Sequence, residues 1–178
     1  MDDDTLLQHA RQLDEAALAE IFDRYYVAIY RYIYHHVGHV ETAEDLAGEV
    51  FQRLLVQFQA RRGPDRHLKA WLFQVASNLV VDDSRRLVHR DHLELDEAVQ
   101  ASDVNVDEQA QQAILAEHTR QAMQKLTPKQ RSIILLKFVE GLENAEVARV
   151  LDMPVGAVKS LQHRALDALR RHLVGVSA

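Results

Sequence analysis

A short segment near the C-terminus contains side chains of the types that can bind nucleic acid: Lys159, Ser160, His163 and Arg164. On an α-helix, at about 100° per residue, they share one side, with Lys159 at its margin. Apolar residues of the same segment fall opposite: Val158, Ala165 and Leu169. Lysine and arginine contact phosphates, while polar side chains of this kind exchange hydrogen bonds with base edges in the major groove. The pattern favours DNA binding over an ordinary solvated helix face.

Residues 126–171 predict three helices that would position these side chains. Thr127 is expected to cap the first helix and Gly141 to end it. Asn144 is expected to cap a short second helix, and Pro154 to open the third. A short helix, a tight turn and a helix with a basic outer face is the helix-turn-helix pattern, whose second helix enters the major groove.

An acidic stripe is expected nearer the N-terminus. A helix predicted from about Glu41 to Gln59 places Asp45, Glu49 and Gln52 at i, i+4 and i+7, opposite an apolar stripe. Two interpretations stay open at this point, a merely solvated surface and a docking face for a basic partner helix.

A basic loop with strong helix breakers follows at residues 61–67, RRGPDRH. A helix is predicted after it, from about Leu68 to Leu87. Polar side chains on this helix are expected to stay accessible: Lys69, Gln74, Ser77, Asn78 and Arg85. Loop and helix together predict a surface that follows phosphates and offers polar groups to bases.

The remaining N-terminal residues predict two more helices, at about 4–12 and 15–37. The second carries several tyrosines at i, i+3 and i+4 spacing, which favours core packing over base stacking. Apolar residues recur at helical spacing throughout, and no segment alternates as a strand would. The chain is therefore predicted to be all-α.

The net charge of −6 over 178 residues is unevenly distributed. Residues 1–60 carry −7 and residues 91–119 carry −8, whereas residues 61–90 carry +4 and residues 120–178 carry +5. The two basic blocks coincide with the two predicted DNA surfaces. There is no cysteine, no apolar run long enough to span a bilayer and no signal-peptide pattern, so a cytoplasmic protein is expected.

Metal-dependent and enzymatic functions are not expected. His35, His36 and His39 lie near acidic residues, but they form no recognisable zinc motif and fall where a helix ends. The sequence has no glycine-rich phosphate loop and no nucleophile elbow. We therefore expect no catalytic residue, no cofactor and no metal.

Three motifs in series resemble bacterial sigma factors. AEDLAGEVFQRL (43–54) resembles the helix that binds core RNA polymerase, and HLKAWLFQVASNLVVDDSRR (67–86) resembles the adjoining helix that opens the −10 promoter element. Residues 126–171 resemble the domain that recognises the −35 element. Their order and spacing, without an intermediate domain, are similar to extracytoplasmic-function (ECF, group IV) sigma factors of the sigma-70 family.

The resemblance implies two small helical domains joined by a flexible acidic linker. Sigma domain 2 would span 1–90, the linker 91–113, and sigma domain 4, the helix-turn-helix, 114–178. It implies the β and β′ subunits of core RNA polymerase and promoter DNA as partners, and allows for an anti-sigma factor. It also implies no membrane insertion, and a cytoplasmic location with association to the nucleoid in the holoenzyme.

The resemblance also implies roles for individual residues. Those expected to bind core polymerase are Asp45, Glu49 and Gln52. Those expected at the −10 element are Arg61, Arg62, Arg66, His67, Lys69, Asn78 and Arg85. Those expected at the −35 element are Lys137, Lys159, Ser160, His163 and Arg164, with Lys137 on phosphate.

Two positions depart from the family pattern. Gly48 stands where the core-binding helix usually has glutamine, which weakens that helix by about 1 kcal/mol relative to alanine. Ser160-Leu161-Gln162 replaces the commoner Ser-Arg-Leu, with the loss of one arginine expected to contact DNA. The alternative to a sigma factor is a helix-turn-helix regulator with an N-terminal sensing or dimerising domain, which has no reason to join an acidic stripe to a basic loop.

The acidic segment between the two predicted domains supports a further hypothesis. Residues 91–119 contain eight acidic residues and no lysine or arginine. The simpler interpretation is that this segment is a solvated tether between the two domains. The sharper hypothesis follows from the resemblance: Asp91, Glu94, Asp96 and Glu97 would imitate nucleic acid inside the basic channel of polymerase until RNA displaces them.

Overall fold

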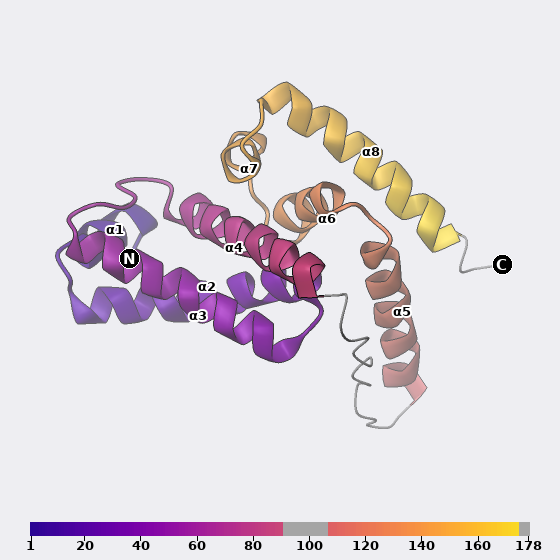
Figure 1. Ribbon diagram of the computed structural model, residues 1–178, viewed down its shortest axis with the longest axis horizontal. Helices are drawn as coiled ribbons and strands as arrows, with labels where there is room; N and C mark the ends of the chain where they lie inside the picture. The colour runs from indigo at the N-terminus through magenta and orange to yellow at the C-terminus, as the bar shows by residue number, and fades with distance from the viewer. Residues whose placement is uncertain (91–106, 175–178) are drawn as a thin grey trace.

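The computed structural model describes residues 1–90 and 107–174, and every regular element in these two ranges is helical (Figure 1). The predicted all-α class is confirmed. The elements are α1 (Asp3–Arg11), α2 (Glu15–Val37), α3 (Val40–Gln59), α4 (Leu68–Arg90), α5 (Asp107–Gln124), α6 (Pro128–Ile134), the π-helix η1 (Leu135–Val139), α7 (Asn144–Leu151) and α8 (Val155–Val174).

Helices α1 to α4 form the N-terminal bundle. Side chains from all four are fully enclosed in its core, and the large ones include Leu6, Ile21, Ile29, Ile33, Leu54, Phe58, Leu72 and Phe73. Each such side chain stabilises the fold by about 1.5–3 kcal/mol through removal from water. Tyr25 and Tyr32 are also buried, which confirms that tyrosines of α2 belong to the core.

Local signals set the helix ends of this bundle. The side chains of Asp2 and Asp14 cap α1 and α2, accepting hydrogen bonds from Thr5 N (2.7 Å) and Ala17 N (2.8 Å). Gly38 ends α2 in the left-handed region, at φ +70°. The predicted bounds of α2 are confirmed, but α4 continues three residues past the predicted end at Leu87 because the following residues include no helix breaker.

Helices α5 to α8, with η1, form the C-terminal bundle. Thr127 caps α6 as predicted, in a reciprocal arrangement: its Oγ1 accepts from Gln130 N (3.2 Å), and Gln130 Oε1 accepts from Thr127 N (3.1 Å). The last turn before Gly141 was not predicted to differ from an α-helix. It is a π-helix, in which Glu140 N donates to Leu135 O (2.9 Å) before Gly141 turns the chain at φ +70°.

The predicted cap of the short helix is one residue off. Glu143 is the N-cap of α7, and Asn144 is already its first residue. Glu146 reaches back to accept a hydrogen bond from Glu143 N (2.9 Å), which satisfies a free donor of the first turn. The Asn144 amide oxygen is instead buried without a partner.

The two bundles lie against each other: α7 packs on α4, and α2 contacts both α5 and α6 (Figure 1). Buried side chains of both bundles belong to one contiguous hydrophobic cluster. Helix α5 begins at Asp107, and the rest of the segment predicted as an acidic linker, residues 91–106 with Asp91, Glu94, Asp96 and Glu97, lies outside the described residues. No helix in the described ranges is long and apolar enough to cross a bilayer.

Candidate nucleic-acid interface

Helix α8 presents the predicted recognition face to solvent. On its inner side Val158, Leu161 and Ala165 are buried against the C-terminal bundle. On its outer side the four predicted residues are exposed: Lys159, Ser160, His163 and Arg164. The short helix, turn and second helix are confirmed. Asp152 makes the turn in the left-handed region at φ +51°, a conformation that aspartate tolerates better than most residues.

The hydrogen bonds of this face leave its side chains available. Ser160 Oγ donates to Gly156 O (3.3 Å) and Arg164 Nε to Ser160 O (3.5 Å), both one turn back on the same helix. His163 Nε2 lies 3.6 Å from Asp167 Oδ2, and both side chains are at least half exposed. Such surface contacts contribute less than about 1 kcal/mol and can give way to DNA. Lys137, the fifth residue predicted at the −35 element, lies half-buried in η1 rather than on α8.

The acidic stripe borders a groove of about 800 Å³ between α3 and α4. Asp45 and Gln52 are exposed, and Glu49 forms a surface ion pair with Arg53 (2.7 Å). Gly48 lies among them, and a Cβ added there would meet nothing within 4 Å. The structure therefore brings the three predicted docking residues together on one groove.

The floor of this groove was not predicted. Trp71 and Val75, expected to face inward from α4, are half-buried and line the groove. Their spacing alone could not reveal this, because it does not determine how α4 packs beside α3.

The basic loop is tightly held by its own backbone. Arg61 N donates to Phe58 O (2.9 Å) and Arg62 N to Gln57 O (2.7 Å). Gly63 adopts φ +94°, and any Cβ there would come within 3.3 Å of the preceding helix, so this turn requires glycine. The side chains expected to meet DNA are exposed: Arg61, Arg62, Arg66 and His67.

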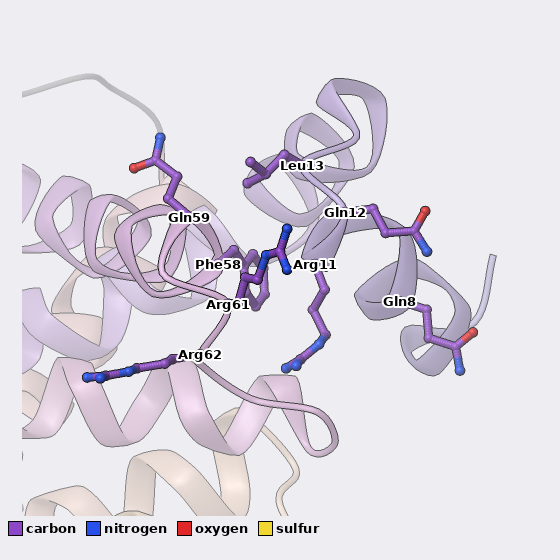
Figure 2. Close-up of a pocket in the computed structure, with 8 residues that line it drawn as sticks. All are labelled: Gln8, Arg11, Gln12, Leu13, Phe58, Gln59, Arg61 and Arg62. Carbon is purple, nitrogen blue, oxygen red and sulfur yellow. The ribbon is translucent and has the colours of Figure 1, made fainter.

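Helix α1 completes a cationic pocket beside this loop, which the sequence did not indicate. Arg11 Nη1 donates to Pro64 O (2.8 Å) and Gly63 O (3.3 Å), across more than fifty residues of sequence. The pocket encloses about 770 Å³, and Figure 2 shows Arg11, Arg61 and Arg62 around it together with Gln8, Gln12, Leu13, Phe58 and Gln59. Its cations and amides suit a phosphate or a base edge, and no acidic residue lines it.

The polar residues of α4 that were expected to be accessible fall into two groups. Asn78 and Arg85 are exposed, as expected. Lys69, Gln74 and Ser77, also expected to be accessible, are half-buried. Lys69 Nζ donates to Glu140 O of the C-terminal bundle (2.6 Å), and Ser77 Oγ lies 3.3 Å from the Tyr32 hydroxyl. Asn78 lies ten residues along α4 from Leu68, about 15 Å at 1.5 Å per residue, and does not line the loop pocket.

The histidines near the end of α2 have structural partners. His36 Nε2 lies 3.1 Å from Ser132 Oγ, and His39 Nδ1 caps α3 by accepting from Thr42 N (3.3 Å). Burial, and then the positive charges of Arg131 and His35, lower the pKa of His36 to about 3. In the ranges that the structure describes, no three histidine, aspartate or glutamate side chains come together as a metal site would require.

The fold and these exposed cationic surfaces are typical of a helical DNA-binding protein. Comparison with known proteins identifies the family to which the chain belongs. Residues 21–90 match the family Sigma-70 region 2, and residues 117–169 match Sigma-70, region 4. The chain is 34% identical to the ECF RNA polymerase sigma factor BldN of Streptomyces coelicolor, over 94% of this chain and 64% of BldN's length. It is 30% identical to the ECF RNA polymerase sigma factor SigW of Bacillus subtilis, over 94% of both chains. The chain belongs to the ECF sigma factors of the sigma-70 family.

Solved structures share the fold. CnrH, in complex with the cytosolic domain of CnrY, superposes with a TM-score of 0.74 at 22% identity, over 97% of both chains. The sigma factor RpoE of Bartonella quintana, in complex with the anti-sigma factor NepR, superposes with a TM-score of 0.70 at 19% identity, over 87% of this chain and 95% of that one. Sigma factors are transcription initiation factors rather than catalysts.

Proposed function

We propose that this protein directs core RNA polymerase to promoters by binding polymerase through the α3 groove and DNA through two separate cationic surfaces. The observation that carries the proposal is that one chain joins an acidic groove to a basic loop-helix unit and to an exposed recognition helix. The alternative is a helix-turn-helix regulator with an N-terminal sensing domain. Such a regulator would need neither the acidic groove nor the basic loop-helix unit. In this function the chain works in the cytoplasm and on the nucleoid, without cofactor or covalent step.

The docking site for core polymerase is the groove between α3 and α4. Asp45, Glu49 and Gln52 present acceptors to a basic helix of the β′ subunit. Gly48 leaves room for a partner side chain to reach Trp71. An apolar floor beneath a charged rim is the usual composition of a protein interface.

The −10 surface consists of the loop pocket and the exposed face of α4. Arg61, Arg62, Arg66, His67, Lys69 and Arg85 follow the backbone of the separated strand. Asn78 binds a base at a different nucleotide from the loop, because about 15 Å separates them. Flipping a base costs a few kcal/mol, which pocket contacts and stacking offset.

The −35 surface is the outer face of α8. Ser160 and His163 contact base edges, and Lys159 and Arg164 contact edges or phosphates, while Lys137 of η1 holds a phosphate. An anti-sigma factor is a further partner in this proposal, supported by the complex of the structural neighbour RpoE with NepR.

Charge reversal of the groove tests the proposal. Replacing Asp45 and Glu49 together by lysine places like charges against a basic partner, so affinity for core polymerase should fall about 100-fold. Asp23→Lys, an exposed acid on α2 outside the groove, is the matched control. Comigration with core polymerase and promoter-dependent transcription are the measurements. A wild-type chain that neither comigrates nor supports transcription would refute the function, and equal binding by the double variant would refute the site.

A further inference from the structure

The pocket beside the basic loop concentrates positive charge. Arg11 of α1 and Arg61 and Arg62 of the loop line it, and none of its lining residues is acidic. Among the described residues, no ion pair involves any of these three arginines. Figure 2 shows the three side chains around one hollow. Three guanidinium groups without an acidic partner therefore meet at a single site.

One of these cations is held in position before any ligand arrives. Arg11 Nη1 donates to Pro64 O (2.8 Å) and Gly63 O (3.3 Å), and Pro64 is itself buried. A guanidinium has five N–H groups, so Nε and Nη2 of Arg11 keep theirs for a ligand. A guanidinium that is already fixed binds phosphate through paired hydrogen bonds and loses little freedom in doing so.

The pocket also offers groups that suit a nucleic base. Gln8 and Gln12 are exposed on α1, and Gln59 is exposed at the end of α3. A glutamine amide can exchange two hydrogen bonds with the edge of adenine. Phe58 is only 2% exposed, whereas Leu13 is 42% exposed. Leu13 therefore supplies the apolar surface against which the flat face of a base can pack.

Two residues of the pocket adopt a strained backbone. Leu13 has φ +63° and Arg61 has φ +55°, a region that glycine would adopt without strain. Four non-glycine residues of the described ranges have a positive φ, and these two both line this pocket. Strain of this kind clusters at ligand sites, where it holds side chains in a binding arrangement. Backbone and side chains thus agree in indicating a ligand site.

Size and charge favour one class of ligand. The pocket encloses about 770 Å³, and small-molecule sites usually measure about 300–1,000 Å³. A DNA strand brings only one negative charge per nucleotide. A nucleoside di- or triphosphate concentrates several negative charges at one end of a small molecule. Three arginines around one pocket match that concentration of charge better than they match a passing strand.

We infer that this pocket binds a free nucleoside di- or triphosphate. The phosphates lie on Arg11, Arg61 and Arg62, and the base packs on Leu13 with its edge toward the glutamines of α1. The bound nucleotide occupies two arginines that the proposed function gives to the −10 strand, so the two ligands compete. Only this competition rests on the proposed function, and the nucleotide site does not.

Titration calorimetry on the full chain tests the site. ATP should bind with a Kd below about 1 mM, AMP should bind about tenfold less tightly than ATP, and adenosine should not bind. Arg62→Gln should weaken ATP binding about tenfold, because a charge-assisted contact is lost. Arg149→Gln, which removes an exposed charge on α7, is the matched control and should change nothing. Absence of ATP binding, or equal losses in the two variants, would overturn the inference.

A second variant distinguishes a nucleotide site from simple attraction of anions. Gln8→Ala combined with Gln12→Ala removes two amides from exposed positions of α1, so the fold should be unaffected. The double variant should bind ATP about fivefold less tightly and bind inorganic triphosphate as the wild type does. If the wild type binds triphosphate as tightly as ATP and the double variant changes neither, the pocket only attracts phosphate and the inference fails.

Competition with a labelled oligothymidine distinguishes a free nucleotide from a DNA strand. ATP should displace the oligothymidine, since both need Arg61 and Arg62, and Arg62→Gln should weaken the binding of both. Binding of the oligothymidine alone would assign the pocket to the strand and overturn the inference. If ATP binds but the oligothymidine is not displaced or does not bind, the nucleotide site stands and the two arginines leave the proposed −10 surface.

Discussion

Helices α8 and α4 both carry side chains assigned to promoter DNA, but they present them differently. The four predicted residues of α8 are exposed, and their contacts lie within the helix itself. On α4, Lys69 is bound to the other bundle, whereas Asn78 and Arg85 are exposed. Recognition of duplex DNA needs only an exposed helix face. Binding of separated strands, in contrast, is useful only once the duplex has opened. The two surfaces therefore differ at one residue: every predicted residue of α8 is free at the surface, whereas Lys69 of α4 is held by the C-terminal bundle.

Acidification should remove this difference, and its effect should be the largest of those described below. The pKa of His36 is about 3 while the two bundles are packed together, because of burial, against an ordinary value of 6.5. The charges facing it are Arg131 of α6 and His35 of its own helix, so no carboxylate compensates its protonation. A chain with separated bundles thus binds more protons, and the packed state is fully stable above pH 6.5 and weakens as the pH falls toward 3. At pH 5 the packed population should fall about 30-fold relative to the separated one, or about 2 kcal/mol.

The chain has no cysteine, so cysteines placed at the exposed Ala19 (α2) and Arg170 (α8) accept a spin-label pair. Distances between the labels, followed from pH 7.5 to 5, measure this effect. His36→Gln cannot take up the proton and should remove most of the pH dependence; the rest is expected from His35, whose pKa is also lowered by burial. His9→Gln, an exposed histidine of α1, should preserve the full dependence. The same pH dependence in His36→Gln would assign the separation of the bundles to another group.

Asn78→Ala should separate the two modules functionally. Loss of a base contact costs about 1–3 kcal/mol, so open complexes should form roughly tenfold less while duplex binding at the −35 element is unchanged. A template with a premelted −10 bubble distinguishes two roles: the defect persists if Asn78 recognises a base and shrinks if it aids strand separation. Normal open complexes and −10 selectivity on duplex promoters would remove Asn78 from the site.

The features of this molecule that could be predicted depend on residues close together in the sequence. Apolar spacing identified the buried side of α8 through Val158 and Ala165. Thr127 as an N-cap and Gly141 as a helix end are likewise local signals. The contacts that join distant elements were not predictable. Arg11 meets the basic loop across 52 and 53 residues, and Tyr32 meets Ser132 across 100.

Two further contacts between the bundles were not predictable, for one physical reason. Arg31 pairs with the Glu140 carboxylate and Lys69 donates to the Glu140 carbonyl, and both contacts depend on how the bundles pack. A pattern of one helix cannot encode that packing. The π-helix that aims Glu140 leaves no signal in the apolar spacing either, since Leu135 and Leu136 are buried as an α-helix would bury them.

Two substitutions on α8 should show what an exposed recognition face does. Lys159→Ala should weaken binding to a −35 duplex severalfold at every sequence and reduce the salt slope by about one, if it contacts phosphate. His163→Ala should instead change preference at one or two base pairs. Binding over a salt series to a panel of substituted duplexes measures both. Unchanged affinity and selectivity in both variants would remove these residues from the interface.

The smallest expected effect concerns Ser77 of α4, whose hydroxyl lies beside that of Tyr32. Ser77 and Tyr32 belong to the same bundle, so Ser77→Ala breaks no contact between bundles, and the 3.3 Å separation is long for two hydroxyls. Tyr32 keeps its bond to Ser132, so the population with packed bundles should fall less than about threefold. The label pair at residues 19 and 170 measures it, with the exposed Ser84→Ala as the matched serine. A tenfold fall would mean that Ser77 holds Tyr32 in the orientation that reaches Ser132. In that case the Ser77 side chain of α4 would contribute to the contact between the bundles by orienting Tyr32.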